Sequence, residues 1–424
     1  MIRFRLAISS FVITICVAAS LAISADWNQW RGPQRDGKSD ETGLTKDWTA
    51  NAPELSWQVD GLGKGYASLA ISDGRMFTLG AIDGQEDLVA LSVEDGAKLW
   101  TVSFGEGDHS NGTPTVDGDR VYAVGLRGDL ICANVETGKV IWQKSFADDF
   151  EGKMMSGWGY SESPLIDGDR LICTPGGPDA LMVALDKMTG ETIWSTKPAE
   201  AESSRGKDGA GYSSIVISEA AGVRQYIQLT GRGLVGVRAV DGEPLWQYNA
   251  IANDVANIPT PIVWDDFVFC STGYGTGAAL LKLTLEAGQM TANEVYFLDA
   301  STFQNHHGGM IRVGTHLFSG HKHNQGFPIC LELESGDVVW GGNQRGPGGG
   351  SAAIVYADGH LIYRYQNGVV ALIEATPDAY RLKGTFEPNF QEGNSWAHPV
   401  VHDGRLLLRE QDKLMCYDIR RKQQ

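Results

Sequence analysis

The chain has 424 residues, of which 52 are acidic and 35 are basic, and its formal net charge at pH 7 is −17. A chain this acidic should repel nucleic acid and anionic membrane surfaces, so we expect no nucleic-acid partner and favour neutral, cationic or calcium-associated ligands. The length suits one large repeat domain, because each repeat of such a domain can build its own core.

Residues 1–25 have the pattern of a secretory signal peptide. Two arginines precede an apolar run over residues 6–23, and Ala25 closes a small-residue cleavage site. We therefore expect an exported protein, periplasmic or extracellular, with no membrane span after cleavage. The alternative is a segment that is kept as an anchor. Lipid attachment at Cys16 is disfavoured, because Ile15 stands where a small residue is expected.

Residues 26–53 form a polar segment rich in Gly and Asp that precedes the first predicted strand. It contains Trp27, Trp30 and Trp48. We expect an N-terminal strap that lies over the repeats, with the three indoles buried as anchors. The alternative is a lid or a contact for a partner.

An eleven-residue unit recurs along the rest of the chain. Each of five copies starts with a small residue, has Gly in seventh place and ends in Trp. Such a unit predicts a strand, a turn in which Gly adopts positive φ, and a second strand whose Trp packs on the neighbouring sheet while its N–H meets a carbonyl. The copies are Ala90–Trp100, Cys132–Trp142, Ala184–Trp194, Gly236–Trp246 and Cys330–Trp340.

The spacing of these units predicts the architecture. The terminal tryptophans are 42, 52, 52 and 94 residues apart, and a degenerate copy over Leu283–Tyr296 divides the last interval. A second pattern, a turn followed by an apolar strand, occurs eight times. Four strands every 40 to 50 residues are typical of a β-propeller blade. We therefore predict an all-β fold over residues 54–424, with eight four-stranded antiparallel blades.

The last predicted blade lacks a fourth strand. We predict that Glu54–Val59, which contains Trp57, completes this C-terminal blade and so removes a free sheet edge.

The eleven-residue unit resembles the repeat of the pyrroloquinoline-quinone-like (PQQ-like) propeller family, Ala-x-Asp-x-x-Thr-Gly-x-x-x-Trp. The resemblance extends over roughly residues 27–418. The family includes quinoprotein alcohol dehydrogenases and the non-enzymatic outer-membrane assembly lipoprotein BamB, so the resemblance implies the fold and leaves the activity open. The full match is at Ala184, Asp186, Thr189, Gly190 and Trp194.

Five cysteines follow the signal segment. Three occupy the small position that opens the repeat and two, Cys173 and Cys270, share the end of the preceding strand. Equivalent positions in different blades are usually too far apart for a disulfide, so we expect buried free thiols. No two are adjacent, whereas the resemblance to methanol-dehydrogenase-type enzymes implies a vicinal pair at the quinone. The five are Cys132, Cys173, Cys270, Cys330 and Cys416.

The starts of the innermost strands should form a ring at one mouth of the channel. The ring mixes aromatic and polar groups, as ligand sites often do. Counting back from the turns gives Tyr66, Asn111, Ser161, Gly211, Ile258, His307, Ser351 and Trp396. Neighbouring positions add His109, Trp158, Tyr160, Glu162, Asn257, Arg345 and His398.

The sixth blade adds a group of histidines. If its strands turn near Gly314, His307 lies opposite His321, while alternation places His323 on the same face as His321. Together with His306, four imidazoles would then gather at the mouth. They could bind a metal, form hydrogen bonds to backbone or ligand, or be unrelated. The second role is favoured and no metal is predicted, since no carboxylate lies in this stretch to complete a site.

These features predict an exported, monomeric, non-catalytic propeller that binds a protein or polymer at the channel mouth. The resemblance leaves two alternatives. One is a PQQ-dependent alcohol dehydrogenase of the polyvinyl-alcohol type, with calcium, with Trp158 or Trp396 as the aromatic floor and with Glu162 as the base. The other is an assembly factor similar to BamB. No catalytic residue or cofactor is predicted, because the ring has no carboxylate and the chain has no Cys-x-x-Cys-His haem motif.

Overall fold

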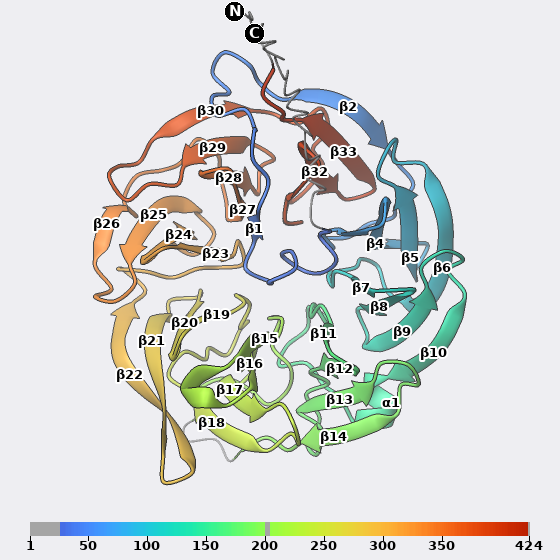
Figure 1. Cartoon of the computed structure of the whole chain (residues 1–424), viewed down its shortest axis with the longest axis vertical. Coiled ribbons are helices and arrows are strands. Elements are labelled where there is room, and N and C mark those ends of the chain that lie inside the picture. The colour runs from blue at the N-terminus through green and yellow to red at the C-terminus, as the bar shows by residue number, and fades with distance from the viewer. Residues whose placement is uncertain (1–25, 200–203, 423–424) are drawn as a thin grey trace, which may run out of the picture.

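The computed structural model describes residues 26–199 and 204–422, in which eight β-sheets are arranged as blades in a ring (Figure 1). The predicted signal peptide lies outside the described residues. Within the described residues, helix is confined to α1 (Phe146–Phe150) and the 3-10 turn η1 (Ala220–Gly222). No described helix is long and apolar enough to cross a membrane. The eight-bladed all-β prediction is confirmed.

Each of the first four blades runs from an inner strand at the channel to an outer strand at the rim (Figure 1). Blade one contains β3 (Ala70–Ser72), β4 (Arg75–Ile82), β5 (Gln85–Ser92) and β6 (Lys98–Glu106). Blade two contains β7 (Thr115–Asp117), β8 (Arg120–Val124), β9 (Asp129–Asn134) and β10 (Val140–Ser145). Blade three contains β11 (Leu165–Asp167), β12 (Arg170–Cys173), β13 (Met182–Asp186) and β14 (Thr192–Thr196). Blade four contains β15 (Val216–Ser218), β16 (Gln225–Thr230), β17 (Gly233–Arg238) and β18 (Pro244–Tyr248).

The next three blades repeat this order. Blade five contains β19 (Ile262–Trp264), β20 (Phe267–Thr272), β21 (Gly277–Glu286) and β22 (Gln289–Asp299). Blade six contains β23 (Met310–Val313), β24 (His316–His321), β25 (Phe327–Glu332) and β26 (Val338–Gly341). Blade seven contains β27 (Ala352–Ala357), β28 (His360–Tyr365), β29 (Val370–Glu374) and β30 (Leu382–Phe386).

The two ends of the chain share blade eight. Its first three strands are β31 (Val400–His402), β32 (Arg405–Glu410) and β33 (Lys413–Asp418), and its outer strand is β2 (Glu54–Val59). Strand β2 runs antiparallel to β33, with Trp57 opposite Cys416. The predicted closure of the ring by the N-terminal strand is therefore confirmed.

Contacts between blades explain why the repeat keeps Gly and Trp. The indole N–H of Trp100 donates to the carbonyl of Val135 in the next blade at 2.9 Å. The ring of Trp100 covers Gly138, where an added Cβ would lie 2.6 Å from it. Gly138 also has a φ of 68°, which favours glycine. Trp142 and Trp194 make the same carbonyl contact with the blades that follow them.

Two repeat tryptophans depart from this contact. Trp246 donates to Gln225 of its own blade at 2.7 Å. The hairpin that follows it, β21–β22, is longer than its counterparts and extends outward from the ring (Figure 1). The indole nitrogen of Trp57 has no hydrogen-bond partner among the described residues. The carbonyl that it should reach by analogy, that of Val93, accepts from Arg405 at 2.6 Å instead.

The N-terminal strap crosses the centre of the ring (Figure 1). Its short strand β1 (Lys38–Ser39) pairs in parallel with β27. Two buried arginines fix it to the inner strands, since Arg31 donates to the carbonyl of Met310 and Arg35 to that of Ser163. The strap therefore lies inside the channel.

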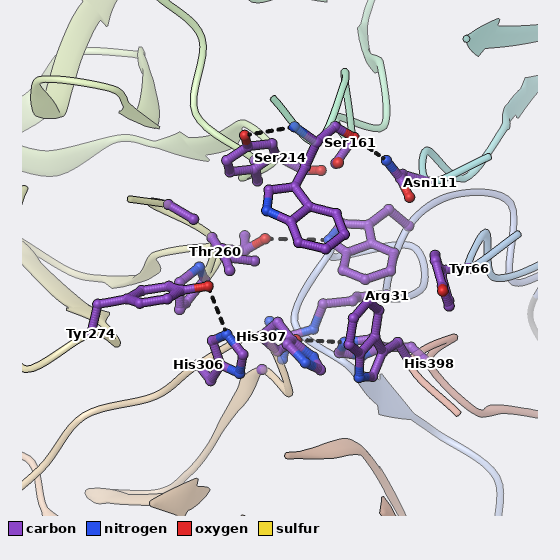
Figure 2. A pocket seen from close by; sticks show the side chains of 18 residues that line it. Arg31, Tyr66, Asn111, Ser161, Ser214, Thr260, Tyr274, His306, His307 and His398 are labelled. Carbon is purple, nitrogen blue, oxygen red and sulfur yellow. Dashed lines mark hydrogen bonds between the residues drawn. The ribbon is translucent and has the colours of Figure 1, made fainter. Parts of the chain in front are cut away.

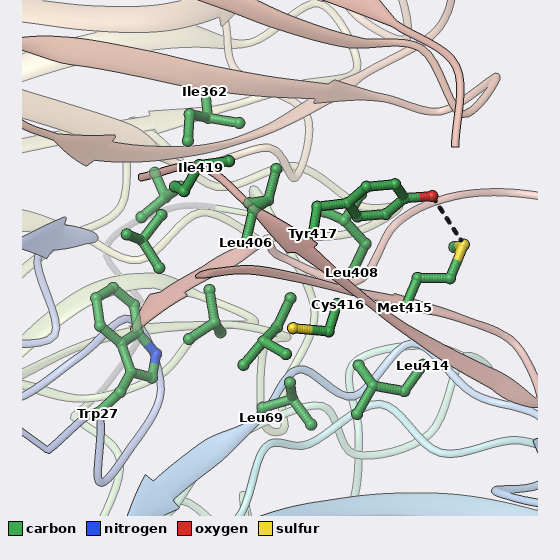
Figure 3. Packing of buried hydrophobic residues seen from close by; sticks show 14 of the residues in the cluster. Trp27, Leu69, Ile362, Leu406, Leu408, Leu414, Met415, Cys416, Tyr417 and Ile419 are labelled. Carbon is green, nitrogen blue, oxygen red and sulfur yellow. Dashed lines mark hydrogen bonds between the residues drawn. The ribbon is translucent and has the colours of Figure 1, made fainter. Parts of the chain in front are cut away.

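Hydrophobic clusters fill the spaces between adjacent blades. One cluster joins blades seven, eight and one with the strap, and it buries Trp48 as well as Trp27, which Figure 3 shows. Trp30, which was expected to be buried as well, is only partly buried. All five described cysteines are buried and free, as predicted.

Candidate functional site

A cavity of about 220 Å³ lies at the centre of the ring (Figure 2). Each inner strand contributes one residue to the ring around this cavity, and that residue stands six positions before the last residue of the strand. Those that line the cavity are Tyr66, Asn111, Ser161, Tyr212, Ile258, His307 and Trp396, while the eighth, Ser351, contacts His306 beside them.

One member of the predicted ring was wrong. Tyr212, and not Gly211, occupies the blade-four position. The inner hairpin of blade four has six residues between paired Ser218 and Gln225, including η1, whereas the corresponding turn of blade three has two between Asp167 and Arg170. Counting back from a turn of ordinary length therefore gave a position one residue too early.

The strap forms the inner end of the cavity. Trp30 and Arg31 line it, and Arg31 also lines a second cavity on the other side of the strap. The Trp30 indole donates to Thr260 at 3.3 Å and packs edge-on against His398, with ring centroids 4.6 Å apart. The channel is thus divided by the strap, and the first cavity is closed at this end.

Aromatic side chains form the opposite end, at the mouth. The rings of Tyr66 and Trp396 lie 4.7 Å apart, and Trp158 approaches Trp396 edge-on at 6.3 Å. Asn111 fixes the loop that carries Trp158 by donating to the Trp158 carbonyl at 3.1 Å. The Tyr212 hydroxyl supports the same loop by accepting from the Trp158 N–H at 3.3 Å.

A belt of hydroxyl groups joins the inner strands next to the cavity. The backbone N–H of Ser68 donates to Thr113, that of Thr113 to Ser163, and that of Ser163 to Ser214, at 2.9 to 3.1 Å. Each bond crosses from one blade to the next. Ser214 and Thr260 reach the cavity from this level.

The histidines at the cavity are neutral. His306 contacts the Ser351 hydroxyl at 2.8 Å through Nδ1 and the Tyr274 hydroxyl at 3.1 Å through Nε2. Burial lowers the pKa of His306 to about 2 and the pKa of His398 to about 3. Burial likewise lowers the pKa of His307 to about 3. Imidazoles of this kind act as hydrogen-bonding groups over the physiological pH range.

The predicted pairing of His307 with His321 was wrong. The blade-six hairpin starts at Met310, which pairs with Ser319, so His307 precedes the hairpin. His321 is buried against Phe303, and its Nδ1 accepts the N–H of Gln304 at 3.2 Å. Its ring is therefore used inside blade six and does not line the cavity.

His323 lies close to the cavity without lining it. Its ring centroid is 4.2 Å from that of His306 and 4.3 Å from that of Tyr274. Burial lowers the pKa of His323 as well.

The remaining predicted site residues lie elsewhere. Tyr160 is buried and donates to the Pro175 carbonyl at 2.8 Å, while Asn257 donates to the Thr230 carbonyl at 2.9 Å, so both hold loops in place. His109 contacts Asp108 and packs edge-on against Tyr66, and it does not line the cavity. Arg345 is exposed on the loop between β26 and β27.

Glu162 joins two blades and does not face the cavity. Its carboxylate accepts from the Thr174 N–H at 2.7 Å, from the Thr174 hydroxyl at 2.9 Å and from Gln228 at 3.3 Å. Burial raises the pKa of Glu162 to about 7, against the effect of the Thr174 bonds and of Arg35. It is therefore a buried structural carboxyl group that cannot reach a molecule in the cavity.

The donor set of the cavity does not fit a calcium-bound quinone. Calcium takes six to eight oxygen ligands, with carboxylates prominent among them. No Asp or Glu belongs to the cavity lining given by the described residues. The described parts of the chain also contain no group of three His, Cys, Asp or Glu side chains placed to hold a metal ion.

Some cavity residues could not be identified from the sequence. Trp30 and Arg31 enter through the course of the strap, which no repeat pattern reveals. Ser214 and Thr260 stand two places after ring members, so the alternation of strands could have found them. Tyr274 lies in the β20–β21 turn of a neighbouring blade.

The fold and the repeat contacts define an eight-bladed propeller of PQQ-like repeats. A model for this repeat type, described as outer membrane protein assembly factor BamB, matches residues 84–342. This match covers more than half of the sequence, and the chain belongs to that family.

Solved structures with the same fold have different activities. BamB from Moraxella catarrhalis superposes with a TM-score of 0.62 at 13% identity, over 88% of this chain and 99% of that one. Quinohemoprotein alcohol dehydrogenase from Comamonas testosteroni superposes with a TM-score of 0.64 at 12% identity, over 96% of this chain and 82% of that one. At these identities the likeness concerns the fold alone. No curated protein matches the sequence significantly.

Proposed function

We propose that this chain is an exported, monomeric binding protein without catalytic activity, which takes a ligand or the end of a partner into the cavity. One observation carries the proposal. The cavity combines aromatic rings, neutral imidazoles and hydroxyl groups above a floor made by the strap, and its lining contains no carboxylate. Such a surface can bind by stacking and hydrogen bonding, and it offers no carboxylate as a general base.

Export rests on the sequence pattern of residues 1–25, with its arginines, apolar run and small-residue cleavage site. The acidic net charge of −17 agrees with a protein that avoids anionic surfaces.

A PQQ-dependent alcohol dehydrogenase, including the polyvinyl-alcohol type, is the first alternative. The structural likeness to two quinohemoprotein alcohol dehydrogenases favours it. The residues of this chain disfavour it, because Glu162 is buried between blades and the cavity offers no carboxylate for calcium.

A role in outer-membrane protein assembly is the second alternative. The family match and the likeness to BamB from Moraxella catarrhalis favour it. Capture of outer-membrane assembly components by the tagged mature chain would support this role over small-ligand binding.

The proposal predicts a molecule that binds in the cavity. Mature protein isolated from its own exported fraction should release the molecule on denaturation, as detected by mass spectrometry. The variant Ile258→Trp, which fills the cavity from its wall, should release none. A released molecule that is equally abundant in this variant would place binding elsewhere and contradict the proposal.

A further inference from the structure

Two imidazoles at the cavity each have a buried ring nitrogen without a hydrogen-bond partner among the described residues. Nε2 of His398 lies 3.2 Å from the carbonyl oxygen of His307. A carbonyl only accepts, so Nε2 carries the proton of this neutral ring and Nδ1 is an acceptor. His398 is 8% exposed, and neither its Nδ1 nor Nε2 of His307 has a hydrogen-bond partner among the described residues. A ligand that reaches Nδ1 of His398 would complete its bonding with an O–H or N–H donor, whereas the unpartnered Nε–H of Arg31 calls for an acceptor.

Hydroxyl groups line other parts of the same cavity (Figure 2). Ser214 accepts from the N–H of Ser163 at 3.0 Å, and Thr260 accepts from the indole of Trp30 at 3.3 Å. Each of the two hydroxyl groups still has its own hydrogen to donate. A ligand whose groups both donate and accept, as alcohols do, matches this mixture better than one with donors alone.

The mouth offers flat apolar faces. Trp158 is 54% exposed, which is a large exposure for an indole, and it stands next to Trp396. Tyr66 extends the same aromatic surface. Aromatic faces of this kind stack on the C–H face of a sugar ring, whose hydroxyl groups then point outward to polar partners.

The charge of the cavity excludes cations. Arg31 is the charged side chain of its lining; its Nη2 donates to the carbonyls of Met310 and Asp36, while its Nε has no partner among the described residues. A cationic ligand would meet no carboxylate there, and it would lie close to a buried positive charge.

Size and shape limit what can enter. The volume of about 220 Å³ lies below the roughly 300 Å³ at which sites for drug-sized ligands begin. Trp30 and Arg31 close the inner end. The cavity therefore has room for one ring at the end of a chain and no passage for the chain itself. We propose that it binds the terminal sugar ring of an uncharged glycan, an inference that rests on the proposed binding function.

The test is calorimetry and tryptophan fluorescence on the full mature chain. The probes are cellopentaose, maltopentaose, mannopentaose and the pentamer of N-acetylglucosamine, together with the cationic pentamer of glucosamine and a Ser-Ala tetrapeptide. At least one neutral pentamer should bind saturably and change the fluorescence, while the cationic sugar and the peptide should not bind.

Three variants locate the binding. Trp158→Ala removes the exposed stacking surface, and His398→Phe keeps a ring but removes the unpartnered acceptor Nδ1, so each should weaken binding about tenfold, the effect of one such contact. Trp264→Ala is the matched control, because this indole packs on Phe267 outside the cavity and its removal should leave the affinity unchanged. Thermal unfolding verifies that each variant is folded.

Absence of binding by every neutral pentamer up to about 10 mM would overturn the inference. So would preferential binding of the peptide or the cationic sugar, or an affinity that survives both cavity substitutions. These outcomes leave the proposed binding function intact, because another ligand class could still occupy the cavity. Turnover of alcohols with bound quinone would instead overturn the proposed function itself.

Discussion

Burial decides the protonation of the cavity histidines, and it has a cost that depends on pH. Burial lowers the pKa of His398 to about 3, from about 6.5 in an unfolded chain. Between these values the unfolded state binds a proton that the folded state does not. Acid therefore destabilises the fold through this residue. The loss of stability begins as the pH falls below about 6.5, and above that pH the residue has no such effect.

The variant His398→Phe tests this linkage. Between pH 6 and pH 4 the free energy of unfolding of the wild type should fall more steeply than that of the variant, by about 1.4 kcal/mol per pH unit. Glu162 acts in the opposite direction, because its pKa is raised to about 7, but it is the same in both proteins and cancels. Urea unfolding at several pH values measures both slopes, and equal slopes would show that His398 is not buried in its neutral form.

Urea unfolding can also measure what the indole hydrogen bond of a repeat tryptophan contributes to stability. Trp100→Phe removes the bond to Val135, whereas Trp57→Phe removes an indole nitrogen that has no partner among the described residues. The first substitution should cost about 1 kcal/mol more than the second, as judged from the urea midpoints. A larger loss in the Trp57 variant would contradict the assigned contacts.

Elements pack through the turn of one blade and the outer strand of its neighbour. Two turn glycines of blade two can be compared, of which only one lies against the neighbouring blade. Gly118 and Gly138 have similar positive φ values, 59° and 68°. Nothing lies within 4 Å of a Cβ added at Gly118, whereas the Trp100 ring lies 2.6 Å from one added at Gly138.

These two glycines separate backbone strain from steric conflict. Both Gly118→Ala and Gly138→Ala pay the backbone cost of positive φ, about 1 kcal/mol. Only the second also displaces an indole, so it should lose a further 1–3 kcal/mol, roughly the cost of overpacking. Thermal unfolding of the pair, with wild type as reference, gives the difference. Equal losses would show that the Trp100 ring does not cover Gly138.

The elements also show what the sequence could predict. The Gly and Trp positions predicted the blades because these residues make contacts of fixed spacing. Counting back from the turns then predicted seven of the eight residues of the ring at the channel mouth. Tyr212 was missed because the turn before Gln225 is long. His321 was misplaced because the hairpin begins only at Met310. The strap residues at the cavity depend on the path of a segment without a repeat.

At the scale of the whole molecule, closure by β2 and occupation of the channel by the strap are separate features. Strand β2 pairs with β33 and completes a blade, while the strap before it provides Trp30 and Arg31 to the cavity. Closure protects the edge of β33, and the strap shapes the site.

Two truncations distinguish these roles. A chain that starts at Glu54 keeps β2 and should fold as a ring, with a lower melting temperature because Trp27 and Trp48 leave their core. A chain that starts at Asp60 lacks β2 and should aggregate through the open edge of β33. Circular dichroism and size-exclusion chromatography compare them. Equal behaviour of the two chains would contradict the role assigned to β2.

The central claim is that the cavity binds without quinone chemistry. The most direct measurement is a calorimetric titration of the mature chain with pyrroloquinoline quinone, with and without calcium, followed by an alcohol oxidation assay with an artificial electron acceptor. We predict no saturable heat up to about 100 µM quinone and no turnover. Saturable, calcium-dependent binding with alcohol oxidation would contradict the claim and establish a dehydrogenase.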